Sequence, residues 1–511
     1  MNYKQASKIH KYWSRKPGQI VSSYIQEFSR ENELIFDPFC GSGTIGIEAL
    51  SLGRSFLGQD LNPFAVFLSN LCLKSNFNEL QFRIEIEKLK KKISSHINSL
   101  YAFEDKIILF ANQGPKCDKT FNCVISDLDY NNKQRINLPD SYIKDNLTLN
   151  LPKGVTFPDR EFPEKFYKDR FSYKGIKKVS DLFSRRNLTA LAILRNEILN
   201  SKYRYQDLFM LALSNTLLHV SKLKSEAIRP LGVNNYWIPD DYIEENVLWR
   251  FLDRLENVAL AKAELQRHLE RGKASDRENA FEVFQRSSIN LDYLEDESID
   301  YLFTDPPYGD VIQYSELSFV WNTWLEFEFD ITNELIVNPV QDKDSKYFLR
   351  EIQEFFKESF RVLKGNRFFT LCFQNKDVNL WFEVAELAYK AGFTLHRVDS
   401  HDFKGSTFNK NWSTKSPKMD FYLTLIKKET AHRQERMEEV FDPTHALRDF
   451  PHSERRDVLN AYIEKGIRAI FEGSVVVKHN KKVLDNFLTL KSIDTNENER
   501  SDEEDSNLRL F

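Results

Sequence analysis

The sequence predicts an α/β fold with a largely parallel β-sheet at its core. A short apolar strand at 34–36 leads into a glycine turn and a helix at 44–52, and a second apolar strand at 299–304 leads into a turn with two prolines. Between 348 and 398, helical and strand patterns alternate, as the crossover connections of a parallel sheet require. An apolar run at 421–426 predicts a final strand.

The first turn, D-P-F-C-G-S-G-T at 37–44, has the chemistry of a ligand site. Gly41 and Gly43 let the backbone approach a ligand that any Cβ would push away, and the helix start supplies free N–H groups. Asp60 ends the next predicted strand and can accept hydrogen bonds from two ribose hydroxyls. The spacing differs from the G-x-G-x-x-G dinucleotide fingerprint, so S-adenosylmethionine fits better than NAD. The alternative is a tight turn without a ligand.

The middle of the chain predicts helices around an irregular region. The stretch at 82–100 carries apolar residues on one helical face, whereas 110–173 is polar and interrupted by Pro and Gly, which predicts loops and short strands. Helical periodicity returns at 181–223 and again at 246–271. A structureless connection of such length is implausible in a compact domain, so we expect this insertion to fold.

The second turn, D-P-P-Y at 305–308, suits a reaction on an exocyclic amino group of a nucleobase. That nitrogen is a poor nucleophile because its lone pair is delocalised, and hydrogen-bond acceptors on its hydrogens favour attack on a methyl group. Asp305 can supply one acceptor and the Pro306 carbonyl another, which Pro306 and Pro307 hold in place by fixing φ. Tyr308 offers a ring for a base flipped out of the duplex. A proline-rich turn at a strand end is the alternative.

Together these motifs resemble those of the S-adenosylmethionine-dependent DNA amino-methyltransferases, the adenine-N6 and cytosine-N4 family. Members carry an H-x-x-x-K-P type element before the cofactor motif, and here His10 precedes Lys16-Pro17 at a slightly longer spacing. The resemblance covers 9–70 and 282–426 well, and in the middle it rests mainly on F-S-R-R-N-L at 183–188. It implies a Rossmann-like methyltransferase sheet whose 421–426 strand is antiparallel.

The resemblance also implies residue roles. Lys16 and Pro17 would border the methionine end of the cofactor, Phe39 would pack near its adenosine, and Ser288 or Asn290 would take the adenine contact that is often acidic in relatives. The cofactor residues that we predict are Lys16, Pro17, Asp37, Phe39, Gly41, Gly43, Asp60 and Ser288, and the catalytic residues are Asp305, Pro306, Pro307 and Tyr308.

The first residue of D-P-P-Y bears on the target base. An initial Asp resembles the adenine-N6 enzymes, whereas cytosine-N4 enzymes more often begin the motif with Ser. Guanine-N2 methyltransferases of RNA can carry D-P-P-Y-G, and Gly309 follows here. We therefore expect site-specific methylation of adenine N6 in DNA, within a restriction-modification or related defence system. DNA cytosine-N4 methylation, RNA guanine-N2 methylation and a non-catalytic DNA-binding subunit are the alternatives, the last opposed by two intact motifs.

The order of the motifs predicts the domain organisation. We expect a cofactor-binding half at 1–75, an inserted helical and irregular region for target recognition at 76–275, a catalytic half at 276–430, a helical C-terminal extension at 431–490 and an acidic, disordered tail at 491–511.

Local clusters of basic and aromatic residues predict DNA contacts. Formal net charge is −4, but the stretch from 494 to 511 contributes −5, which leaves the remainder near neutrality. The predicted contacts are Lys404, Lys410, Trp412 and Lys415 in one segment and Lys222 and Arg229 in another. Solvated loops are the alternative reading of both segments.

The cysteines predict a cytoplasmic protein with reduced thiols. There are five, scattered along the chain, and no run of 18 apolar residues predicts a membrane span. Cys117 and Cys123 would need two further ligands to bind zinc, so we expect no metal. The last residues, Asn507, Leu508, Leu510 and Phe511, resemble the Q-L-x-L-F peptides that dock on bacterial sliding clamps. A clamp and a cognate restriction nuclease are therefore candidate partners, beside double-stranded DNA.

Overall fold

The computed structural model describes residues 6–113, 123–137, 142, 149–166, 175–225, 236, 238–272, 280–328, 330–375, 377–402, 419–428 and 455–472. The chain divides into two compact units. Unit 1 comprises Met1–Asn290 and Ile312–Asp344, and unit 2 comprises Leu291–Val311 and Ser345–Phe511. The predicted functional division of the chain stays a prediction.

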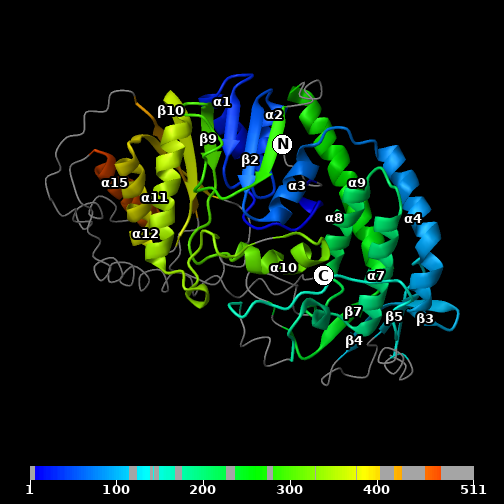
Figure 1. Ribbon diagram of the computed structural model, residues 1–511. Coiled ribbons are helices and arrows are strands. Elements are labelled where there is room, and N and C mark those ends of the chain that lie inside the picture. The colour runs from blue at the N-terminus through cyan, green and yellow to red at the C-terminus, as the bar shows by residue number, and fades with distance from the viewer. Residues whose placement is uncertain are drawn as a thin grey trace, which may run out of the picture. The chain divides into compact units, whose positions relative to one another are not determined.

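Unit 1 contains three parallel strands that carry the first motif. β1 (Leu34–Asp37) pairs with β2 (Ser55–Asp60), and β2 pairs with β8 (Phe281–Gln285). α2 (Thr44–Ser51) connects β1 to β2, and α3 (Pro63–Leu73) follows β2, while α1 (Gly18–Phe28) packs on α2 (Figure 1). The strands and α2 confirm the predicted strand, glycine turn and helix at the N-terminal end of the sheet.

Long helices make up much of the rest of unit 1. They are α4 (Glu79–Ser99), α7 (Arg185–Asn200), α8 (Gln206–Leu217) and α9 (Val247–Leu269), and α9 packs against both α4 and α8 (Figure 1). Polar caps fix where α4, α7 and α9 begin, since the side chains of Asn78, Ser184 and Asn246 each accept a backbone N–H of the first turn. The periodicity at 181–223 predicts helix throughout, but the structure has two helices with a break at 201–205.

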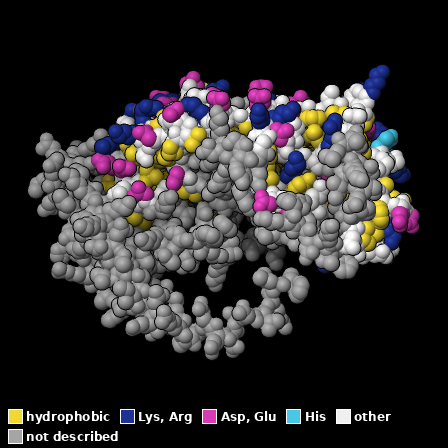
Figure 2. All heavy atoms as spheres, turned by 90° about the horizontal axis from the view of Figure 1, so that it is seen from below, with side chains coloured by type: hydrophobic (Ala, Val, Ile, Leu, Met, Phe, Trp, Pro, Cys, Tyr) yellow, Lys and Arg dark blue, Asp and Glu magenta, His cyan; other side chains and the backbone are white. Residues whose placement is uncertain are grey.

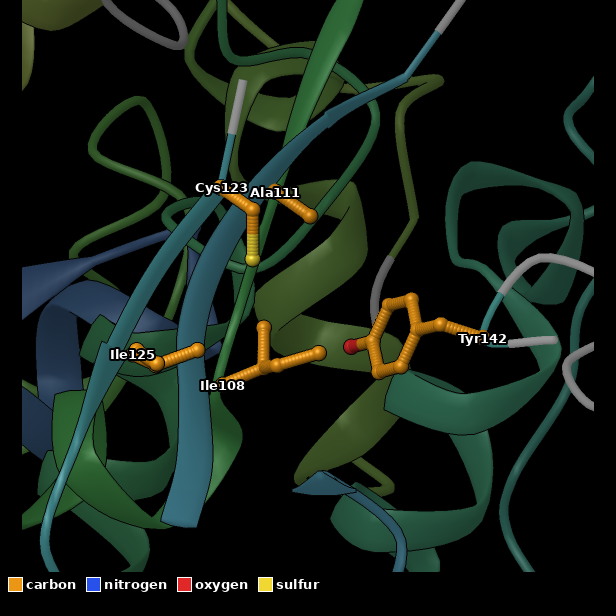
Figure 3. Packing of buried hydrophobic residues seen from close by; sticks show 5 residues of the cluster. All are labelled: Ile108, Ala111, Cys123, Ile125 and Tyr142. Carbon is orange, nitrogen blue, oxygen red and sulfur yellow. The ribbon is translucent and has the colours of Figure 1, made fainter. Parts of the chain in front are cut away.

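A second, antiparallel sheet lies in the insertion. It contains β3 (Ala102–Phe103), β4 (Lys106–Gln113), β5 (Cys123–Ser126), β6 (Gln134–Ile136) and β7 (Tyr242–Glu245). Ile108, Ala111, Cys123, Ile125 and Tyr142 form its buried cluster, and Figure 3 shows Ile108 and Tyr142 pointing toward each other. Burial raises the pKa of the Cys123 thiol to about 12, so it behaves as an apolar side chain. Cys117 lies outside the described residues.

The segment F-S-R-R-N-L holds α7 to this sheet. Arg186 is 1% exposed, forms an ion pair of 2.8 Å with Glu244 of β7 and stacks 3.4 Å from the ring centre of Tyr142. Asn187 accepts the hydroxyl of Tyr101 at 2.7 Å. A buried ion pair is costly to break once formed, which gives these residues a structural role in the fold.

Unit 2 contains β9 (Ile299–Thr304), β10 (Leu363–Phe373), β11 (Thr394–Asp402) and β12 (Met419–Ile426). β9 and β10 are parallel, whereas β12 pairs antiparallel with both β10 and β11, as expected for the final strand. The helices are α11 (Ser345–Val362), α12 (Val378–Ala391) and α15 (Arg455–Phe471). With parallel pairs in both units, the predicted α/β class is confirmed.

Two further observations concern the described residues as a whole. No helix among them is long and apolar enough to span a membrane. No group of three or more His, Cys, Asp or Glu side chains in the described ranges could hold a metal ion. The predicted acidic tail and most of the predicted C-terminal extension lie outside the described residues.

Candidate cofactor and catalytic sites

The turn after β1 has a backbone that only glycine adopts easily. Gly41 has a φ of +50° and Gly43 a φ of +79°. A Cβ on Gly41 would lie 3.0 Å from Cε1 of Tyr12, and one on Gly43 would lie 3.1 Å from Oγ of Ser69. Asp37 is buried at the strand end, and its Oδ1 accepts the backbone N–H of Phe39 at 3.1 Å. The turn therefore depends on two glycines for its backbone conformation and on Asp37 for the hydrogen bond at its start.

Asp60 stands beside this turn at the end of β2. Its Oδ2 accepts the N–H of Gly41 at 2.9 Å, and its Oδ1 accepts the N–H of Asn62 at 2.9 Å. Burial raises the pKa of Asp60 to about 6, although both hydrogen bonds favour the charged form. A carboxylate has about four acceptor sites, so this group can also receive two ribose hydroxyls. The geometry fits the predicted contact.

Lys16 and Pro17 line a cavity next to the turn. Its volume is about 380 Å³, and Arg15, Ser42, Thr44 and Glu48 also line it. The size is in the range of small-ligand sites, and the combination of cationic and hydroxyl groups suits the polar amino-acid end of S-adenosylmethionine. The structure thus brings Lys16 and Pro17 together with the glycine turn, as the resemblance implies.

An aromatic pair that sequence reasoning missed borders the same turn. The rings of Tyr12 and Tyr314 are stacked, with centroids 6.1 Å apart and an interplanar angle of 29°. Burial raises the pKa of Tyr12 well above its usual range, and the nearby Asp60 carboxyl adds to the shift. Tyr314 begins α10 (Tyr314–Trp324) and is far from Tyr12 in the sequence, so no local spacing signals the pair.

Three buried polar side chains, those of Asn62, Ser318 and Asn322, form hydrogen bonds next to Asp60. Nδ2 of Asn62 donates to Oγ of Ser318 at 3.0 Å, and Nδ2 of Asn322 donates to Oδ1 of Asn62 at 3.2 Å. Both partners lie on α10. They fix the residue whose N–H donates to Asp60, and sequence reasoning did not identify them.

Ser288 follows β8 and is buried. The backbone N–H of Arg286 donates to the carbonyl of Asp60 at 3.1 Å, and Nε2 of Gln59 donates to the carbonyl of Ser287 at 3.1 Å. These bonds place the segment around Ser288 beside the end of β2, where the resemblance expects the adenine contact. The contact itself stays a prediction.

The catalytic motif follows β9 in unit 2. Tyr308 is buried, its hydroxyl donates to Oδ1 of Asp305, and its ring makes an edge contact with Phe373 at 5.6 Å. Nδ2 of Asn375 donates to the carbonyl of Tyr308 at 2.7 Å. Burial raises the pKa of Tyr308. Asn375 is a support that the sequence did not indicate, and base stacking by Tyr308 stays a prediction because its ring is covered here.

The structure leaves several predicted residues untested. The cofactor residues belong to unit 1, and Asp305 to Tyr308 belong to unit 2. Nζ of the half-buried Lys222 donates to the carbonyl of Asp181 at 3.0 Å, and burial lowers its pKa. Arg229, Lys404, Lys410, Trp412, Lys415, Asn507, Leu508, Leu510 and Phe511 lie outside the described residues.

Comparison with known proteins agrees with this chemistry. The N6/N4 methyltransferase family model, described as DNA methylase, matches residues 1–71. The chain is 25% identical over 338 residues to the Type II methyltransferase M.MvaI of Kocuria varians, covering 63% of this chain and 58% of that protein. It is 21% identical over 458 residues to the Type II methyltransferase M.MjaII of Methanocaldococcus jannaschii, covering 80% and 78%.

A shorter match has higher identity. The Type II methyltransferase M2.LlaDCHI of Lactococcus lactis is 46% identical over 50 residues, which is 10% of this chain and 19% of that protein. A solved S-adenosylmethionine-dependent methyltransferase of Methanosarcina mazei aligns with a TM-score of 0.25 at 10% identity, over 79% of this chain and 97% of its own. The cofactor that the family match implies is S-adenosyl-L-methionine, and Gly41, Asp60 and the adjoining cavity fit it. The chain is thus related to the DNA amino-methyltransferases of the N6/N4 family, as its motifs predict.

Proposed function

We propose that this protein is a site-specific DNA methyltransferase that transfers a methyl group from S-adenosylmethionine to N6 of adenine. The observation that carries the proposal is that the same chain has two motifs, each directly after a β-strand. One is a glycine turn with Asp60 bound to its backbone, and the other is Asp305-Pro306-Pro307-Tyr308 after the fully buried strand β9. The initial Asp of the second motif favours adenine N6 over cytosine N4.

Different residues of the chain would bind the cofactor and activate the target amine. S-adenosylmethionine supplies an electrophilic methyl group when bound. Asp60 holds the ribose, Phe39 packs near the adenosine, and Ser288 contacts the adenine. Lys16 and Pro17 border the methionine end, while Asp37 and the two glycines shape the turn. Each role rests on the family resemblance and on the positions described above.

Asp305 and the Pro306 carbonyl would activate the target amine. Each accepts a hydrogen bond from the amino group, which moves the nitrogen lone pair out of the ring and toward the methyl carbon. The Tyr308 hydroxyl already donates to Oδ1 of Asp305 and so orients the carboxylate. Proline on both sides of the carbonyl keeps it in position. The methylated nitrogen would release one proton, and the Asp305 carboxylate, which accepts a hydrogen bond from that amine, would take it.

A restriction-modification or related defence role is the biological setting that we propose. Two relatives that match over more than half of this chain carry the name Type II methyltransferase, which supports this assignment. We further propose that the protein acts in the cytoplasm on double-stranded DNA, alongside a cognate nuclease. A sliding-clamp contact through 507–511 and DNA contacts through the two predicted basic segments remain part of this proposal.

The test is to identify the methylated nucleoside. Purified protein is incubated with methyl-labelled S-adenosylmethionine and either mixed-sequence duplex DNA or total RNA, and each nucleic acid is digested to nucleosides. Labelled N6-methyladenine from DNA is the expected product. Label at N4 of cytosine would show that the target base is cytosine. Label only in RNA guanine would show that the substrate is RNA. No transfer despite cofactor binding would favour a non-catalytic subunit.

Asp305→Asn tests the assigned chemistry. We expect it to lower kcat by about two orders of magnitude or more, as removal of a group that acts in the transition state does, with cofactor affinity unchanged. Asp399→Asn is the matched control, because Asp399 of β11 forms a half-exposed pair of 2.6 Å with Arg397 that contributes little stability. Equal activity in both variants would contradict the role of Asp305.

A further inference from the structure

A group of cations on unit 1 lies outside the predicted site residues. We call it the cationic cluster; it consists of Lys11, Lys133, Lys224, Arg250 and Arg254. On the face shown in Figure 2, basic and acidic side chains are interspersed over the described surface, in keeping with a net charge of −4. A concentration of cations within one unit therefore needs its own explanation.

One aromatic ring and two acids connect four members of the cluster, Lys133, Lys224, Arg250 and Arg254. Nζ of Lys133 lies 5.3 Å from the ring centre of Trp249, and Cζ of Arg250 lies 4.8 Å from it. Arg250 also pairs with Glu245 at 2.7 Å. Asp253 pairs with Arg250 at 3.0 Å and with Arg254, and Lys224 pairs with Glu245.

The cluster keeps an excess of positive charge at its surface. Lys224, Arg250 and Arg254 share the two carboxylates of Glu245 and Asp253, and Lys133 lies over the ring of Trp249. The side chain of Glu245 is only 4% exposed, whereas those of Lys224 and Arg254 are 21% and 20% exposed. Glu245 therefore lies beneath Lys224 and Arg250, while Asp253, 43% exposed, pairs with the two arginines at the surface, so that three cations share two acids.

The lowered pKa of His219 is consistent with positive charge near this cluster. Burial, together with the charges of Arg250, Arg254, Lys224 and Lys11, lowers the pKa of His219 to about 2. His219 is therefore neutral at physiological pH and adds no charge to the cluster. The four named cations come from the segment before α1, the segment after α8 and the first turns of α9.

The cluster also adjoins the cofactor turn within unit 1. Lys11 directly precedes Tyr12, whose ring would meet a Cβ on Gly41 at 3.0 Å. We propose that the cationic cluster binds the phosphate backbone of duplex DNA. The proposal rests on the proposed function. Duplex DNA is the ligand because these cations come from four separate parts of the chain, which suits a repeating polyanion better than one phosphate, and arginine forks match phosphate oxygens.

The salt dependence of DNA affinity tests this directly. Each lost phosphate contact lowers the slope of log Kobs against log salt concentration by about 0.9 for duplex DNA. We expect Lys133→Gln and Arg254→Gln each to reduce the slope by about that amount and the double variant by about twice it, measured by fluorescence anisotropy from about 50 to about 200 mM KCl. Affinity for all duplex sequences should weaken to a similar degree.

Matched controls lie on α4 of the same unit. Lys88 is exposed there, and Arg83 pairs with Glu79 and Glu256 much as Arg254 pairs with Asp253. Lys88→Gln and Arg83→Gln should leave the slope unchanged. If Arg254→Gln does not fold, the exposed Lys133 still provides the test, and Arg254→Lys should retain the wild-type slope.

The outcomes separate this inference from the proposed function. Wild-type binding to duplex DNA with the same slope in cluster and control variants would overturn the cationic cluster as a DNA contact and leave the methyltransferase proposal in place. Failure of the wild-type protein to bind or methylate duplex DNA would overturn the proposed function itself. Binding of RNA alone, with the expected slope changes, would overturn the choice of DNA as ligand.

Discussion

Gly41 and Gly154 share a left-handed backbone but differ in their surroundings. Gly41 has a φ of +50° and borders Tyr12, whereas Gly154 has a φ of +81° and a Cβ there would meet nothing within 4 Å. We expect alanine at either position to lower the free energy of unfolding by about 1 kcal/mol because of the backbone strain. Only Gly41→Ala should weaken S-adenosylmethionine binding, since its Cβ crowds the turn.

Denaturant unfolding and calorimetric titration of both glycine variants check this prediction. The comparison removes backbone strain as an explanation, because both variants carry it. Equal affinity for S-adenosylmethionine in Gly41→Ala and Gly154→Ala would show that the turn does not contact the cofactor.

The ionisation of Asp60 should set the pH dependence of cofactor binding. Its pKa of about 6 is raised by burial, so the carboxyl group becomes neutral as the pH falls through that value. An ionised carboxylate accepts ribose hydroxyls more strongly than a neutral one. We expect the Kd for S-adenosylmethionine to be constant above pH 7 and to rise below pH 6, at most tenfold per pH unit.

Asp60→Asn should bind weakly and without that inflection. Isothermal titration calorimetry of the wild-type protein and Asp60→Asn across the same pH range measures the Kd for S-adenosylmethionine. An inflection near pH 6 that persists in Asp60→Asn would assign the titration to another group.

At the scale of an element, α10 carries a carboxyl group with no compensating cation in direct contact among the described residues. Glu316 is 1% exposed, and its Oε1 accepts Nδ2 of Asn338 at 2.9 Å and Nε2 of Gln341 at 3.0 Å. Burial raises the pKa of Glu316 to about 7, partly opposed by these bonds. The helix therefore places an acid in an environment that favours its neutral form.

This raised pKa makes stability depend on pH. Between the ordinary value of 4.5 and about 7, the folded protein binds more protons at Glu316 than the unfolded chain, so the free energy of unfolding falls as the pH rises through this window. Glu316→Gln removes the titration. We expect the variant to gain on the order of 3 kcal/mol relative to wild type between pH 4 and pH 8.

Urea unfolding at a series of pH values measures the difference. Glu328→Gln is the control, because the side chain of Glu328 is 97% exposed, and its stability should follow that of wild type at every pH. A constant difference between Glu316→Gln and wild type would show that Glu316 does not titrate with folding.

At the scale of the whole molecule, local patterns predicted the elements better than their partners. One of the helical patterns expected between 348 and 398 is α12, whose start is capped by Asp377 and which ends at Gly392, with a φ of +115°. The pairing of β4 with β7 could not be predicted, since Phe110 and Glu245 lie far apart in the sequence and strand partners have no local signature.

The candidate site shows the same division. Gly41, Asp60 and Asp305 follow apolar strands and could be recognised from residue type and position. Tyr314 and Asn375 could not, because each acts through a residue that is distant in the sequence. Residues that carry the chemistry were thus predictable, whereas residues that position them required the fold.

Cofactor binding should be visible in the exchange protection of the strands that carry the site. A ligand at one hundred times its Kd stabilises the state that binds it by about 2.7 kcal/mol, which slows exchange through openings that destroy the site about a hundredfold. We expect this slowing for amides of β1 and β2 when S-adenosylmethionine is added, measured by hydrogen exchange and mass spectrometry. Asp305→Asn should retain the full effect and Asp60→Asn should lose most of it at the same ligand concentration. Loss of protection in Asp305→Asn as well would mean that the catalytic motif also holds the cofactor, and that binding and chemistry do not divide between the two motifs.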